Sequence, residues 1–380
     1  RRLIRPSPKI GHSSFPILTD HKIAGKAPTE KFFRVSKGIY MTKHKVILSL
    51  TAVAVIVLAA AASVSALHIV GYIDLDDGVL SRIIEAGVVR PRDWLIYAEE
   101  PDRFVGYQDA TGRMAEPCPG PDSGTAVLFA FGQSNAANFG PSRRQGQPGL
   151  LNFNIFDGKC YRAADPLLGS SGDGGTIWTA LGNRLISDGA FDSVIVVPIA
   201  VGGSSINRWA DPRDLGARID FAGVALRDAG IKATHVLFVQ GETDHHAAAA
   251  WARLRPSEFV RLRPDGSRYS MRSEAYEAHF LTARKHLNRL GIDGPIYVAV
   301  KTRCGDIGPD IEGPVSRAQR GLARDHDEIH PGPNINAFND LNYRPDLCHL
   351  SDAGIEKVAD IWAKMLVGND AIQSNPASQR

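Results

Sequence analysis

The stretch TAVLFAFGQSN, residues 125–135, decides the fold expected for this chain. Its first seven residues are almost continuously apolar, which is typical of a parallel strand buried on both faces. Three further runs of this kind follow: SVIVVPIA at 193–200, THVLFVQ at 234–240 and PIYVAVK at 295–301. Helical patterns separate these runs, so the sequence predicts an α/β fold with a doubly wound parallel sheet between two helical layers.

Amphipathic helices are expected between the strands and after the last of them. The predicted helical segments are 176–186, 217–229, 274–290, 315–324 and 353–366. In sheets of this class, ligands bind at the carboxyl ends of the strands. Polar clusters follow three of the predicted strands, and we examine them as candidate parts of one site.

The first two clusters contain serine and glycine. Ser134 follows the first strand and is expected to open a helix, where free N–H groups would surround its hydroxyl. The alternative is an ordinary N-cap serine. The second cluster is GGSS at 202–205, in which the N–H of Gly203 can point at a substrate because glycine allows close approach of the backbone. Gly-Ser pairs also form simple turns.

The third cluster is QGETD at 240–244, followed by two histidines. The Gln240 side-chain amide is a candidate hydrogen-bond donor to an oxyanion, and Glu242 is a candidate support for neighbouring loops. Asp244, His245 and His246 suggest a metal site. No further ligand stands at a suitable spacing, so we predict a solvated loop and no metal there.

A carboxylate and an imidazole stand three residues apart near the C-terminus. Asp346 can hold the His349 ring in the tautomer that a general base needs. Ser351 then caps the last helix. Asp327 and His330 have the same spacing, but Pro-Gly-Pro follows them, which predicts a turn rather than a packed catalytic loop.

The series GQSN at 132–135, GGSS at 202–205, QGETD at 240–244 and DLCHL at 346–350 resembles the SGNH-hydrolase superfamily. Within it the chain is similar to the sialate O-acetylesterase-like branch, which includes carbohydrate esterase family six. RAQ at 317–319 also resembles that branch. The resemblance implies a three-layer α/β/α sandwich of the SGNH or flavodoxin-like kind. It also implies hydrolysis of acetyl esters, often on sugars, without a cofactor.

The same resemblance assigns a role to each matching residue. It makes Ser134 the nucleophile, His349 the base, Asp346 its orienting partner and Gly203 a backbone oxyanion donor. The superfamily has an asparagine as a further donor where this chain has QGE, and Gln240 is our preferred candidate for that donor. Two alternatives stay open: an O-acyltransferase acting on a cell-envelope glycan, and an inactive carbohydrate-binding module.

The charge distribution points to a membrane rather than to nucleic acid. Residues 1–45 hold 11 Lys/Arg and two acids, which leaves the rest of the chain with a net charge near −6. Residues 46–66 carry no charge, and we predict a transmembrane signal anchor over 46–70. Its basic flank places the catalytic domain outside the cytoplasm. Cleavage after Ala66, with secretion, is the alternative.

The remaining chain divides into a juxtamembrane connector at 71–124, an esterase domain at 125–367 and a flexible tail at 368–380. Met41 is a candidate start of translation, with residues 1–40 upstream of it; the alternative is that residues 1–40 form a disordered cytoplasmic tail.

The four cysteines all follow the predicted anchor, where disulfides are common, although free buried thiols are an alternative. Three pairings are open. We favour Cys304 with Cys348 because both are expected at one sheet edge, which leaves Cys118 with Cys160.

Overall fold

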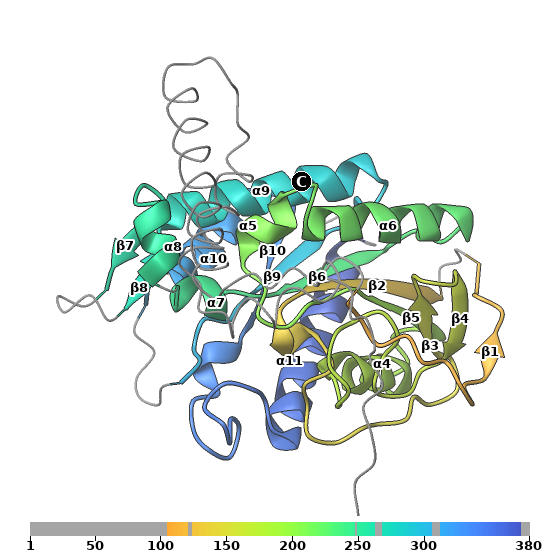
Figure 1. The fold of residues 1–380 in the computed structure, drawn as a ribbon. Helices are drawn as coiled ribbons and strands as arrows, with labels where there is room; N and C mark the ends of the chain where they lie inside the picture. Colours follow the sequence, from red (N-terminus) through yellow and green to blue (C-terminus); the bar gives the residue numbers. More distant parts are fainter. Residues whose placement is uncertain (1–104, 121–123, 248, 263–267, 306–311, 374–380) are drawn as a thin grey trace, which may run out of the picture. The chain divides into compact units, whose positions relative to one another are not determined.

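The computed structural model describes residues 105–120, 124–247, 249–262, 268–305 and 312–373 (Figure 1). They belong to the second of two compact units, residues 77–380. The predicted basic segment at 1–45 and the predicted anchor at 46–70 lie outside the described residues, as do most of the connector and the end of the tail. Within the described ranges, no helix is long and apolar enough to cross a membrane.

An eight-stranded sheet organises the domain. Its spatial order is β1 (Ala115–Glu116), β4 (Lys159–Arg162), β3 (Leu150–Asn154), β5 (Ser193–Pro198), β2 (Thr125–Gly132), β6 (His235–Val239), β9 (Ile296–Val300) and β10 (Ile329–Asn334). The six strands from β3 to β10 are parallel, and β4 and β1 extend one edge in antiparallel fashion.

The central strand β2 shows why the sheet needs a layer on each side. All eight of its residues are buried. Alternate side chains point to opposite faces, so Phe129 and Phe131 join one core cluster while Leu128 and Ala130 join the other. This confirms the interpretation of continuous apolar runs as strands buried on both sides.

Helices cover both faces of the sheet (Figure 1). The cluster with Phe129 contains residues of α5 (Ile206–Ala210), α6 (Leu215–Asp228), α9 (Ser273–Arg289) and α10 (Pro314–Asp325). The cluster with Leu128 contains residues of α4 (Ile177–Ser187) and α11 (Asp352–Gln373). The helices agree with the predicted segments to within a few residues, apart from the longer α11, and α5 was not predicted. The three-layer α/β/α sandwich is present as expected.

A small insertion follows β6. It consists of α7 (Glu242–His245), α8 (Ala249–Leu254) and the antiparallel hairpin of β7 (Phe259–Arg261) and β8 (Tyr269–Met271). The described residues also form two single turns of 3-10 helix, η2 (Ser134–Ala136) and η3 (Ile335–Ala337). The helix predicted to begin at Ser134 is therefore only one turn long.

The predicted turn after His330 is wrong. Residues Ile329–Asn334, including Pro331 and Pro333, form β10, which pairs in parallel with β9 at the sheet edge. Proline lacks a backbone N–H, and an edge strand tolerates that loss because one side has no neighbour to accept from it. A register shift between Pro331 and Asn334 accompanies the two prolines.

Candidate active site

The turn after β2 carries the predicted nucleophile. Gly132 has φ 134°, and a Cβ there would collide with the carbonyl oxygen of Val239, so only glycine fits. The Gln133 N–H donates to the same oxygen at 3.0 Å. These constraints place Ser134 at the start of η2, at the carboxyl end of the central strand, where it is 6% exposed.

Asp346 and His349, the predicted orienting carboxylate and base, lie within hydrogen-bonding distance of each other. His349 Nδ1 lies 2.6 Å from Asp346 Oδ2, and the N–H of His349 donates to Asp346 Oδ1 at 2.7 Å. Burial raises the pKa of Asp346, but hydrogen bonds from the His349 ring and from the N–H groups of Cys348 and His349 outweigh it and lower that pKa. An ionised carboxylate on Nδ1 leaves Nε2 as the ring nitrogen that can accept a proton.

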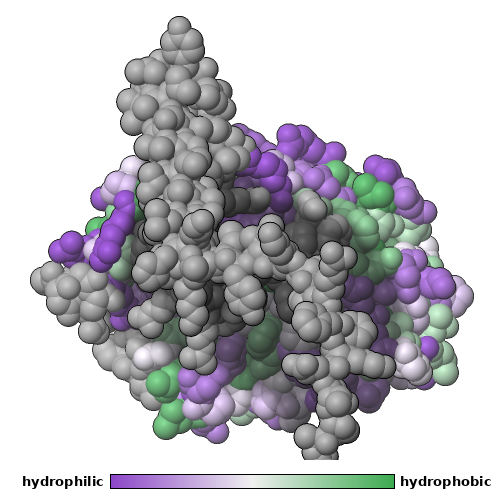
Figure 2. Space-filling model, viewed as in Figure 1, coloured by the Kyte–Doolittle hydropathy of each residue, from purple (hydrophilic) through white to green (hydrophobic). Residues whose placement is uncertain are grey.

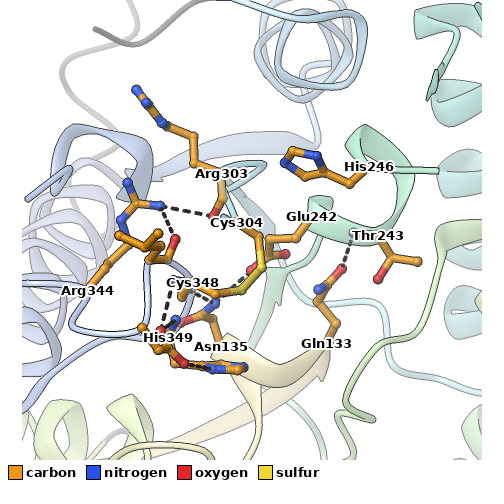
Figure 3. Close-up of a disulfide and its surroundings, with 12 residues drawn as sticks. Gln133, Asn135, Glu242, Thr243, His246, Arg303, Cys304, Arg344, Cys348 and His349 are labelled. Atoms are coloured by element: carbon orange, nitrogen blue, oxygen red, sulfur yellow. Dashed lines mark hydrogen bonds and ion pairs between the residues drawn. A yellow bond between two sulfur atoms is a disulfide. The ribbon is translucent and has the colours of Figure 1, made fainter. Parts of the chain in front are cut away.

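The loop that carries this pair is held from several directions. Leu347 adopts a left-handed φ of 67°, and its carbonyl accepts hydrogen bonds from Gly305 N and Arg344 Nη1, each at 3.1 Å. The Cys304–Cys348 disulfide joins the loop to the segment after β9 (Figure 3). Ser351 caps α11 by accepting from Gly354 N at 3.1 Å, as predicted.

Asn135 connects the nucleophile turn to the histidine loop. Its Nδ2 donates to the carbonyl of Cys348 at 3.3 Å (Figure 3). Its Oδ1 accepts from Leu350 N at 3.2 Å. The two bonded residues, Cys348 and Leu350, are the sequence neighbours of His349. The bonds therefore hold His349 at the sheet edge that carries Ser134. The sequence analysis did not identify Asn135 as a functional residue, although it stands within the quoted GQSN motif.

Glu242 contacts both Asn135 and Lys301. Its Oε1 accepts from Asn135 Nδ2 at 2.7 Å and lies 3.4 Å from Lys301 Nζ. The Glu242 and Lys301 side chains are 2% and 0% exposed, so each charge depends on the other. The predicted supporting contacts of Glu242 with neighbouring loops are therefore present.

Gly203 lies on the loop after β5, at the same edge of the sheet. It is exposed and has φ 69°, and its carbonyl accepts from Thr243 Oγ1 at 3.2 Å. Among the hydrogen bonds recorded for the described residues, none uses the N–H of Gly203 or that of Ser134. Both backbone donors are thus available to an oxyanion.

Gln240 has other partners than an oxyanion. It is fully buried, and its Nε2 donates to Gln133 Oε1 at 3.1 Å, to Ser204 O at 3.0 Å and to Asp244 Oδ2. Its Oε1 accepts from Tyr276 OH at 2.8 Å. An amide nitrogen has two hydrogens, and these acceptors engage both. The geometry therefore favours a role in bracing the loops and does not support our prediction of a third oxyanion donor.

The prediction of a solvated loop is wrong for Asp244. This carboxyl is 1% exposed, and its Oδ2 accepts from Ile206 N at 3.0 Å, which anchors the start of α5. Burial raises its pKa to about 7. Across the described ranges, no group of three or more His, Cys, Asp or Glu residues is arranged to hold a metal ion.

His330 lies at the opposite end of the sheet. It pairs with Tyr297 near the beginning of the parallel strand β9, and their rings are 5.1 Å apart. Burial lowers the pKa of His330. Ser134 follows the carboxyl end of β2, whereas His330 lies near the amino end of the parallel strand β10. The two residues are therefore at opposite ends of their strands.

Both predicted disulfides are confirmed. Cys304 pairs with Cys348 on the loop that carries His349, and Cys118 pairs with Cys160 of β4.

Residues 125–265 match the family of carbohydrate esterases described as sialic acid-specific acetylesterases. The chain is therefore a carboxylic ester hydrolase. Over this stretch the chain is similar to the sialate O-acetylesterase-like branch of the SGNH hydrolases.

Comparison with curated proteins found no match. Among solved structures, a protein from Arabidopsis thaliana has 15% identity and a TM-score of 0.45, covering 65% of this chain and 98% of that chain. NanS has 14% identity and a TM-score of 0.42, covering 67% and 99%. A carbohydrate acetylesterase from Xanthomonas citri has 16% identity and a TM-score of 0.40, covering 64% and 57%.

Proposed function

We propose that the domain hydrolyses short-chain acyl esters, chiefly O-acetyl esters on a carbohydrate, through Ser134, His349 and Asp346. The observation that carries this proposal is the Asp346–His349 pair, which Asn135 ties to the turn bearing Ser134. The family match supports an acetyl ester on a carbohydrate as the substrate.

In the proposed mechanism, His349 Nε2 takes the proton of Ser134 as the hydroxyl attacks the ester carbonyl. The N–H groups of Ser134 and Gly203 donate to the resulting oxyanion. His349 then returns the proton to the leaving alcohol, and water activated by the same imidazole hydrolyses the acyl-enzyme. Asp346 holds the ring and stabilises its charged form throughout. The residues that carry these steps require no metal or organic cofactor.

The test compares Ser134→Ala with Ser187→Ala, a matched control on the exposed end of α4. Only Ser134→Ala is expected to abolish hydrolysis of p-nitrophenyl acetate and release of acetate from acetylated glycans, with an unchanged circular dichroism spectrum. Wild-type kcat in Ser134→Ala would contradict the mechanism. Activity should survive EDTA. Acyl transfer to an added sugar in preference to water would identify an O-acyltransferase, and failure with every acyl ester would favour a binding module.

We also propose that residues 46–70 anchor the protein in a membrane, with the esterase domain outside the cytoplasm. The two disulfides support this location because such bonds persist in oxidising compartments. Protease added to intact spheroplasts is expected to digest the domain. Protection until the cells are lysed would contradict the orientation. Recovery of the domain in the medium, lacking residues 1–66, would favour secretion.

A further inference from the structure

An exposed aromatic ring lies against the imidazole of the proposed base. Phe139 is 39% exposed, and its ring lies 5.4 Å from that of His349, centroid to centroid, with 13° between their planes. Other exposed apolar side chains include Phe221 and Val224 on α6, and Figure 2 shows hydrophilic and hydrophobic residues interspersed over the visible surface. The position of Phe139 beside the reacting groups calls for an explanation.

The same ring reaches the loop that carries Gly203. A Cβ added at Gly202 would lie 2.8 Å from Phe139 Cζ, and one added at Gly172 would lie 2.9 Å from its Cε2. The ring therefore occupies space that these two glycines leave open. Its face lies against His349 and its edge against the glycines, so it extends from the base to the oxyanion loop.

The backbone on both sides of Phe139 is fixed. Asn138 N donates to Ser171 O at 3.0 Å, and Gly140 N donates to Gly175 O at 2.7 Å. The buried side chain of Asn138 adds a hydrogen bond to Leu167 O at 2.9 Å. A ring attached to such a backbone can act as a rigid wall.

We propose that Phe139 is a specificity-determining residue that forms one wall of the acyl pocket and restricts the acyl group to about the size of acetyl. The inference rests on the proposed function. In the tetrahedral intermediate, the former carbonyl carbon is bonded to Ser134 Oγ, the oxyanion faces Gly203 and the leaving oxygen faces His349. The remaining substituent is the acyl chain, and it meets the ring that extends between those two positions.

This geometry favours an acyl wall over a platform on which a sugar ring stacks. A stacking platform presents an aromatic face to the sugar, and His349 covers one of the two faces of Phe139, which leaves only the opposite face for such a contact. The edge in contact with the glycines is covered as well. Truncation of the side chain would therefore enlarge the space beside the reacting carbon.

The experiment measures kcat/KM for p-nitrophenyl acetate, butyrate and hexanoate. Because the leaving group is constant, the hexanoate-to-acetate ratio isolates the acyl pocket. One methylene in an apolar pocket changes selectivity by about 10-fold or more. We therefore expect Phe139→Ala to raise this ratio at least ~10-fold and Phe139→Leu to raise it less. The control is Phe221→Ala, which removes an exposed aromatic ring from α6. It is expected to leave the hexanoate-to-acetate ratio unchanged.

An unchanged ratio in both folded Phe139 variants, with equal losses on all three esters, would show that the ring only orients His349 and would overturn the proposal. An increase in KM for acetylated glycans without a change in the ratio would assign the ring to sugar binding and overturn it as well. Failure of the proposed function looks different: the wild type would hydrolyse none of the esters, or Ser134→Ala would stay active.

Discussion

Replacement of Cys304 and Cys348 by alanine is expected to slow catalysis, whereas the same change at Cys118 and Cys160 is expected to leave it nearly unchanged. The two disulfides make a matched pair because they close loops of similar length, with sequence separations of 44 and 42. On the chain-entropy model each stabilises the fold by about 4 kcal/mol. The two double variants should therefore lose similar free energies of unfolding.

The two bonds differ in what they hold. Cys348 precedes His349, the proposed base, and its disulfide joins the loop that carries both residues to the segment after β9. Cys160 lies on β4, which β3 and β5 separate from the central strand β2. A displacement of about 1 Å in a catalytic group can cost about 100-fold in rate. We therefore expect kcat/KM to fall at least ~10-fold only when the Cys304–Cys348 bond is removed.

Urea denaturation of the wild type and both double variants would measure the stability losses. Esterase kinetics would then be compared at a temperature at which all three proteins are folded. Equal activity losses in the two variants would refute the positional argument. Very different unfolding free energies would refute the assumption that loop length governs stabilisation here.

Three further outcomes are expected. His349→Ala should lose activity by several orders of magnitude, whereas His330→Ala should stay within about tenfold of wild type; the opposite result would refute the assignment of the base. Glu242→Gln removes the carboxylate that lies 3.4 Å from the buried Lys301 ammonium and should cost about 3–5 kcal/mol in urea denaturation, and adding Lys301→Met should restore most of it; no recovery would refute the ion-pair argument. The pKa of Asp244 is raised in the folded state, so the folded protein retains a proton that the unfolded chain loses, and this contribution to stability should decline as pH rises from about 4 to about 7. Urea denaturation of Asp244→Asn across that range should show a shallower decline; an unchanged slope would exclude Asp244 as its source.

The predicted strands were those whose residues are apolar throughout. Strand β3 lacks that pattern because Asn152 stands in it, fully buried, with its Oδ1 accepting from Leu168 N at 2.6 Å. Such a side chain looks like a loop residue until its partner is known. Strand β10 was missed because its two prolines favour a turn in sequence, and only its edge position makes them acceptable as strand residues.

The contact between Asp346 and His349 was predictable because a carboxylate and an imidazole three residues apart on one loop can hydrogen-bond to each other. Contacts were not predictable where a side chain has several candidate partners. The Gln240 amide suits an oxyanion or a buried network equally well in sequence, and only the positions of Ser204 and Asp244 assign it to the network. The sequence did not indicate that Phe139 belongs to the site, because a lone aromatic residue after a motif does not reveal which ring it will contact.

The hydrogen bond from Leu350 N to Asn135 Oδ1 joins residues 215 positions apart. During translation, the turn with Ser134 and the loop with Gly203 would therefore leave the ribosome well before His349, the proposed base. A nascent chain that has emerged only as far as β9 would hold Ser134 and Gly203 without His349, and would have no imidazole to activate the serine. On the proposed mechanism, ester hydrolysis begins only after the last loop docks, so the onset of activity during synthesis would report the moment at which the two ends of the domain meet.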